Sequence, residues 1–147
     1  MSEIRLVPRG IRNNNPGNLI YVPNINWRGE IGVDGRLLIF DTMLNGVRAC
    51  VKDLLAGFKE VNRTAGKSGE DTIREIITEF APPHENDTEA YIAAVSQRSG
   101  FGPDLVLTPD QETLFKLATA IFHHENGGDF VSDADIAAGV VAALEGA

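Results

Sequence analysis

The sequence is poor in the features that mark secreted and membrane proteins. It carries one cysteine, Cys50, in 147 residues, so no disulfide can form within the chain. No apolar run approaches the ~20 residues of a membrane-spanning helix, and the N-terminus lacks the apolar core of a signal peptide. We therefore expect no membrane insertion, and we expect the protein either to act in the cytoplasm or to be carried out by other means.

Positive charge is also scarce. The chain has 13 Lys and Arg against 21 Asp and Glu, a formal net charge of −8 at pH 7. Such a chain is a poor candidate for binding nucleic acid. The acidic excess lies after residue 65, whereas the part before it is modestly basic. That basic part predicts either contact with an anionic polymer or simply a solvated surface.

The motifs of metal, nucleotide and serine chemistry are absent. His123 and His124 are adjacent and diverge by ~100° on a helix, and neither an H-x-x-x-H pair nor a Cys/His cluster accompanies them. There is no G-x-S-x-G elbow and no phosphate-binding glycine loop. Cys50 lies within a predicted helix beside a core position, which favours a buried, inert thiol. We expect no metal and no cofactor.

Length and hydrophobic periodicity predict one domain over residues 1–147, a mainly α-helical (α+β) fold with a small N-terminal β-hairpin. Residues 1–18 are expected to be irregular, with 1–10 as a tail, and residues 19–22 to form a short strand. Asp34 and Gly35 mark the turn of the hairpin. About five helices follow, with expected starts at Asp41 or Thr42, near Asp71 and Thr72, after residues 86–88, at Thr108 and at Ser132.

In the fourth of these helices, one carboxylate lies on the apolar face. At ~100° per residue, Leu117 and Ile121 belong to one stripe, and Glu125 falls near its middle. Apolar surroundings favour the protonated carboxyl, which is the state that a general acid needs at neutral pH. The two glycines that follow would end the helix and leave room beside it. The alternative is a half-buried glutamate at a helix end that bonds loop backbone.

A glycosidase of the two-carboxylate type needs a second Asp or Glu across its cleft. Glu30 is the best candidate because it precedes the hairpin turn and follows Trp27. Sugars bind to aromatic rings and to amide side chains. Residues 12–30 supply Asn15, Asn18 and Trp27 among many asparagines. These residues form either a sugar cleft or the capping asparagines and core tryptophan of an ordinary folded loop.

Several motifs of the chain occur in a distinctive combination. They are Arg9-Gly-Ile-Arg-Asn-Asn-Asn-Pro-Gly-Asn18, then Trp27-Arg-Gly29 and Asn45-Gly-Val-Arg-Ala49, then Ala81-Pro-Pro-x-Glu-Asn-Asp-Thr88 followed by Tyr91. Together, over residues 9–128, they resemble a family of phage and prophage virion-associated proteins that degrade peptidoglycan. The segment Ile121-Phe-His-His-Glu-Asn-Gly127 is also similar to the catalytic segment of goose-type lysozymes and lytic transglycosylases.

In those enzymes the glutamate helix precedes the β element, whereas here it follows, which implies a circularly permuted lysozyme-like fold. The resemblance implies cleavage of the β-1,4 bond between N-acetylmuramic acid and N-acetylglucosamine, with Glu125 as general acid and base. It also places Tyr91 and Gln97 in the sugar cleft, on a helix that faces the core. The implied partners are peptidoglycan strands and other virion proteins, and the implied location is the virion or the host cytoplasm or periplasm.

Two routes and two alternatives stay open. In a lytic transglycosylase the muramic 6-hydroxyl closes a 1,6-anhydro ring, whereas in a hydrolase Glu30 would activate water or stabilise the oxocarbenium ion. Because no second carboxylate stands out, we favour the transglycosylase. The first alternative function is a non-catalytic virion or wall-binding protein with the same fold. The second, a peptidoglycan amidase or peptidase, would need a metal or an active thiol, for which the sequence offers poor candidates.

Overall fold

The N-terminal segment folds into a short helix followed by an asparagine-rich loop, residues 13–18, called the asparagine loop below. The computed structural model describes residues 6–59, 70–83 and 86–145. Helix α1 (Arg9–Arg12) follows Pro8, whose φ is −54° and whose carbonyl accepts the N–H groups of Ile11 and Arg12, each at 3.0 Å. The prediction that residues 1–18 are irregular is therefore wrong for residues 9–12, and its first five residues lie outside the described part of the chain.

A two-stranded antiparallel hairpin follows this loop. Strand β1 (Glu30–Asp34) pairs with β2 (Leu37–Phe40), and their two-residue turn has Gly35 in the left-handed region, with φ of 63°. Leu38 and Phe40 point into the core. The hairpin predicted around Asp34 and Gly35 is confirmed.

The strand predicted for residues 19–22 is wrong in extent. Only Ile20 forms a bridge, with Leu37 of β2, and the side chains of residues 20–22 are exposed. Pro23 follows at once and lacks the N–H group that would extend the ladder.

Five longer helices make up most of the rest of the described chain. They are α2 (Met43–Lys59), α3 (Ile73–Phe80), α4 (Thr88–Ser99), α5 (Gln111–Asn126) and α6 (Asp133–Leu144). Each begins after a side chain that accepts a backbone N–H group; these caps are Thr42, Thr72, Asp87, Asp110 and Ser132. The predicted continuation of the first of them to residues 64–66 lies outside the described residues.

The predicted start of α5 at Thr108 is wrong. The Asp110 carboxylate accepts the Thr113 N–H group at 2.8 Å, and the helix begins at Gln111. An aspartate is a strong N-cap, so the helix is capped by Asp110 and not by Thr108, two residues earlier. The other helix starts agree with the sequence signals.

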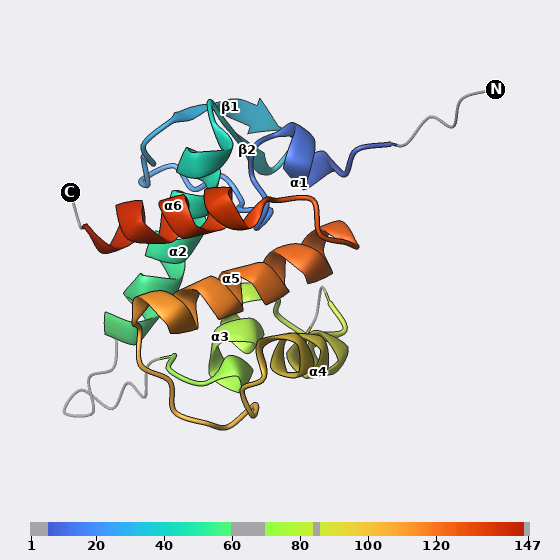
Figure 1. Ribbon diagram of the computed structural model, residues 1–147. Helices are drawn as coiled ribbons and strands as arrows, with labels where there is room; N and C mark the ends of the chain where they lie inside the picture. The colour runs from blue at the N-terminus through green and yellow to red at the C-terminus, as the bar shows by residue number, and fades with distance from the viewer. Residues whose placement is uncertain (1–5, 60–69, 84–85, 146–147) are drawn as a thin grey trace.

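Helix α6 lies across α2, and these two helices form the most extensive contact between elements (Figure 1). A Cβ atom at Gly139 of α6 would lie 2.3 Å from Val47 Cγ1 of α2, so the close approach requires glycine. Helix α5 packs between α4 and α6. The buried apolar side chains of β2 and of helices α2 to α6 form one core cluster.

This arrangement, mainly α with a small N-terminal sheet, confirms the predicted fold class. Helix α5 runs along the core and brings its C-terminal end close to α1 and the asparagine loop (Figure 1). None of the helices in the described ranges is long and apolar enough to cross a membrane.

Candidate functional site

Glu125 occupies the last turn of α5, half-buried, with a side-chain donor on each carboxylate oxygen. The Asn18 Nδ2 group donates to Oε1 at 2.8 Å, and the Tyr91 hydroxyl donates to Oε2 at 2.7 Å. Helix α5 then ends at Gly127, which caps it in the left-handed conformation with φ of 70°. The apolar wall expected around this carboxylate is therefore interrupted by two polar partners, and both are side chains rather than loop backbone.

Tyr91 is held rigidly inside the molecule by aromatic neighbours. It is 2% exposed on α4, and its ring lies 6.4 Å from Phe80 and 3.9 Å from the ring of His124. Burial, and then the neighbouring charge and hydrogen bond of Glu125, raise the pKa of Tyr91 well above its usual value. The hydroxyl therefore keeps its proton at neutral pH and acts as a fixed donor to the carboxylate.

Asn18 reaches Glu125 because the asparagine loop is strongly bent. Asn18 has φ of 51°, a left-handed conformation that asparagine tolerates better than most residues, and its N–H group bonds the Asn15 carbonyl at 3.0 Å. From the other side, Asn126 Nδ2 donates to the Pro16 carbonyl at 2.9 Å. The loop and the end of α5 are thus joined directly.

Asn15 belongs to the fold rather than to a sugar cleft, which corrects its assignment as a substrate-binding residue. Its side chain is fully buried, donates to the carbonyls of Leu19 at 3.0 Å and Leu38 at 2.9 Å, and accepts the Leu19 N–H group at 2.9 Å. These bonds tie the loop to β2. A buried amide committed in this way cannot reach a substrate.

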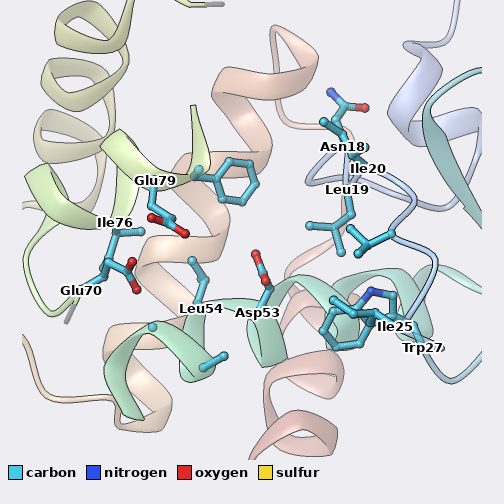
Figure 2. A pocket seen from close by; sticks show the side chains of 14 residues that line it. Asn18, Leu19, Ile20, Ile25, Trp27, Asp53, Leu54, Glu70, Ile76 and Glu79 are labelled. Atoms are coloured by element: carbon cyan, nitrogen blue, oxygen red, sulfur yellow. The ribbon is translucent and has the colours of Figure 1, made fainter. Parts of the chain in front are cut away.

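Two open pockets are lined by Glu125 or by its partner Asn18. A groove of about 280 Å³ has Asn18 at one end, with Ile25 and Trp27 on one side and Asp53 and Glu79 pointing into it (Figure 2). A second pocket of about 270 Å³ is lined by residues 86–87 and 90–91, His124 and Glu125 itself. The hydrogen bond from Asn18 to Glu125 therefore bridges the two pockets.

The other predicted site residues differ in whether they line these pockets. Trp27 is half-buried and lines the larger pocket. Glu30 lines neither pocket, and its Oε1 accepts the Trp27 N–H group at 3.3 Å. Gln97 is exposed on α4 and lines neither pocket. The structure thus brings Asn18, Tyr91 and Glu125 together, leaves Trp27 in the adjoining groove, and places Glu30 and Gln97 outside it.

The sequence reasoning missed two members of the cluster. His124 stacks on Tyr91 at the mouth of the smaller pocket, and Asn126 anchors the asparagine loop to α5. His124 was considered only as a metal ligand. The local signal for both was their position beside Glu125 at a helix end that two glycines terminate.

Cys50 is a buried thiol of helix α2. It is fully buried on α2, and burial, with the charges of Asp53 and Glu125, raises the pKa of its thiol well above the usual value. The predicted burial of Cys50 is confirmed. In the described part of the chain, no three side chains of His, Cys, Asp and Glu group as metal ligands.

Comparison with known proteins identifies a phage relative. The chain is 33% identical over 132 residues to Protein P5 of Pseudoalteromonas phage PM2, a match that covers 87% of this chain and 77% of the relative. The chain belongs to the family of this phage protein. No protein-family model matches the chain. Kinship with P5 supports the phage origin expected from the sequence motifs.

Proposed function

We propose that this P5-family chain cleaves the glycan strands of peptidoglycan at the β-1,4 bond between N-acetylmuramic acid and N-acetylglucosamine. Glu125 is the general acid and base of this reaction. One observation carries the proposal: a half-buried carboxylate held by two donors lines one pocket, and one of those donors, Asn18, lines a second pocket. A polymer that passed through both pockets would lay one linkage against Glu125.

The proposed reaction begins with proton transfer from Glu125 to the glycosidic oxygen. The bond between that oxygen and muramic C1 then breaks, and charge develops on the Glu125 carboxylate. Tyr91 and Asn18 donate to the two oxygens of the ionised carboxylate, so they stabilise this charge. Since the Tyr91 hydroxyl keeps its own proton, it serves as a positioning and stabilising donor rather than as a second acid.

The second step favours the lytic transglycosylase route. The Glu125 carboxylate takes the proton of the muramic 6-hydroxyl as that oxygen bonds C1 and closes the 1,6-anhydro ring. This route needs one carboxylate. The hydrolytic route with Glu30 as partner loses support because Glu30 turns back to the Trp27 backbone and lines neither pocket. If the reaction is hydrolytic instead, Asp53 and Glu79 become the candidates, because both face the groove beside Asn18.

The larger groove suits a sugar chain in its side-chain chemistry. Trp27 and Ile25 offer apolar surface to sugar faces, and the carboxylates of Asp53 and Glu79 offer hydrogen-bond acceptors to hydroxyl and N-acetyl N–H groups. The partner proposed for the site is therefore the glycan strand. Given the kinship with a phage protein, the place of action proposed is a virion or an infected host.

The deciding experiment is mass spectrometry of soluble products from purified peptidoglycan treated with wild type, Glu125→Gln and Glu112→Gln. Glu112 is a matched control, since it lies exposed on the same helix in an ion pair with Lys116. We expect 1,6-anhydromuropeptides from wild type and Glu112→Gln and none from Glu125→Gln. Reducing-end products with the same dependence would mean a hydrolase.

Absence of products from wild type would contradict the enzymatic proposal. The alternative is then a non-catalytic virion or wall-binding protein, which sedimentation with insoluble peptidoglycan would reveal. Equal activity in wild type and Glu125→Gln would instead remove Glu125 from the chemistry and leave the cleavage to another group.

A further inference from the structure

Two buried amide oxygens beneath Glu125 lack hydrogen-bond donors. They are Oδ1 of Asn18 and Oδ1 of Asn126, and neither accepts a hydrogen bond from the described residues. Both face Gly10: a Cβ atom built there would lie 2.6 Å from the Asn18 oxygen and 2.8 Å from the Asn126 oxygen. Buried acceptors without partners are uncommon, and each calls for a physical reason.

The orientation of Asn126 is fixed by its own bonds. Its Nδ2 group donates to the carbonyls of Pro16 and Phe122, each at 2.9 Å, so its oxygen has to face Gly10. Turning this amide over would break both bonds and place its oxygen against two carbonyls. The Asn126 oxygen therefore stays oriented toward Gly10 as an acceptor, and Asn18 is the neighbour that could donate to it.

The orientation of Asn18, in contrast, depends on the charge of Glu125. A carboxylate only accepts hydrogen bonds, so it requires the Nδ2 group of Asn18, which donates at 2.8 Å. A protonated carboxyl can instead donate an O–H group, which the Asn18 oxygen can accept. The amide would then turn over about its last side-chain torsion and direct Nδ2 toward Gly10 and Asn126.

We propose that Asn18 and Asn126 form an amide relay that turns over with the protonation of Glu125. When Glu125 is ionised, the Asn18 amide nitrogen donates to its carboxylate, and the amide oxygens of Asn18 and Asn126 accept no hydrogen bond from the described residues. In the protonated state the Asn18 oxygen accepts from Glu125, and its nitrogen donates to Asn126. The only covalent change is one O–H bond at Glu125, whose proton comes from solvent or from the substrate hydroxyl. Asn18 and Asn126 are positioning residues that favour the reprotonated acid.

The catalytic meaning of the relay rests on the proposed function, whereas its existence does not, because it operates in the protein without substrate. Other titratable groups border Glu125. Tyr91 on α4 and Cys50 on α2 have raised pKa values and keep their protons. Asp87 at the start of α4 and His124 on α5 stand exposed at the mouth of the smaller pocket. On α1, Arg9 is bound to Asp34 at 2.6 Å.

The test is nuclear magnetic resonance of the isotope-labelled wild-type protein across a pH titration. We expect the Asn18 side-chain N–H protons to show contacts to the Gly10 Hα protons while Glu125 is protonated and to lose them once it is ionised. The midpoint of this change should coincide with that of the Glu125 carboxyl carbon. The Asn126 side-chain protons should keep their contacts throughout, since Asn126 does not turn. Because the wild-type protein is used, folding of a variant does not limit the result.

A variant locks the relay in its second state. In Glu125→Gln, Tyr91 donates to the amide oxygen and the amide nitrogen faces Asn18, so Asn18 must turn over at every pH. We expect the contact between Asn18 and Gly10 to persist from pH 4 to pH 8 in this variant, while Glu112→Gln follows wild type.

The relay is overturned if the Asn18 amide keeps one orientation across the titration, or if it turns at a midpoint unrelated to Glu125. A pH-dependent amide in a protein that releases no product from peptidoglycan would sustain the relay and end the proposed enzymatic function. Product release with a static amide would do the reverse. The two proposals therefore fail separately.

Discussion

Replacement of Asn15 by alanine is the sharpest test of how the asparagine loop is built. The side chain is fully buried and makes three hydrogen bonds, two to the backbone of Leu19 and one to the Leu38 carbonyl. Alanine keeps none of them. If Asn15 is structural, the variant loses stability, whereas a substrate-binding residue at the same position would affect binding and leave stability unchanged.

The size of the loss follows from which backbone groups keep other partners. The Leu19 carbonyl still accepts the Leu38 N–H group at 3.0 Å. The Leu19 N–H group and the Leu38 carbonyl lose the partner that Asn15 supplies. At about 1–3 kcal/mol for each of these two buried groups left unpaired, Asn15→Ala should lose about 2–6 kcal/mol. That is a large part of the ~5–15 kcal/mol that stabilises a typical domain.

Urea unfolding followed by circular dichroism at neutral pH measures this difference directly. Asn24→Ala is the control, because Asn24 is an exposed asparagine of the same N-terminal segment. We expect the control to unfold within about 0.5 kcal/mol of wild type, as surface substitutions usually do. A third variant, Asn15→Asp, keeps the acceptor for Leu19 but turns a carboxylate toward two carbonyls, so it should be the least stable at pH 7.

A loss below about 1 kcal/mol for Asn15→Ala would refute the reasoning. It would mean that water replaces the amide, and so that the loop is open enough to admit solvent. In that event the assignment of Asn15 to the fold would fall, and its original assignment to the cleft would return.

Three further predictions follow from the site. Tyr91→Phe keeps the ring between Phe80 and His124 but removes the donor to Glu125, so product release should slow by roughly tenfold, the equivalent of ~1.4 kcal/mol, with unfolding little changed. Trp27→Ala should weaken binding to cell-wall fragments in a sedimentation assay, because the ring lines the larger groove. Asp34→Asn should destabilise the protein at neutral pH. The hydrogen bond from Arg9 holds the pKa of Asp34 well below its usual range, so the stabilisation is present above the ordinary value of ~3.9 and disappears as pH falls further.

Each of these has a matched control and a contradicting result. Tyr21→Phe removes an exposed hydroxyl, and a similar slowing there would show that the effect is not specific to the site. Unchanged wall binding by a folded Trp27→Ala protein would remove the indole from the cleft. If the stability difference between wild type and Asp34→Asn stayed constant from pH 7 to pH 2, the ion pair with Arg9 would not be its source.

Local signals in the sequence were enough to predict most of the helical frame. The hydroxyl groups of Thr42, Thr72 and Ser132 act within three residues, so a short window contains both the cap and the backbone group it bonds. The same window failed at α5, where Thr108 and Asp110 compete and only the folded geometry selects the aspartate. It also failed at α1, a single helical turn that Pro8 begins.

The centre of the site could be predicted only in part. Helical periodicity turns Glu125 inward, but its partners come from 107 and 34 residues away, which no periodicity reveals. The amide-rich stretch around Trp27 supplied Asn18, and the family resemblance supplied Tyr91. Neither source could distinguish Asn18 from Asn15, because the two differ in a tertiary contact: the Asn15 amide donates to the Leu38 carbonyl of β2. That choice belongs to tertiary packing and not to the motif.

The bond between Asn18 and Glu125 has a consequence for how the protein is made. At synthesis rates of ~5–20 residues per second, roughly 5 to 20 seconds separate the first of these residues from the second. The asparagine loop, Trp27 and Tyr91 all leave the ribosome before the carboxylate does. A nascent chain that has not yet reached α5 therefore carries the proposed glycan-binding surfaces and lacks the proposed acid, so the proposed cleavage can begin only when synthesis of the site is complete.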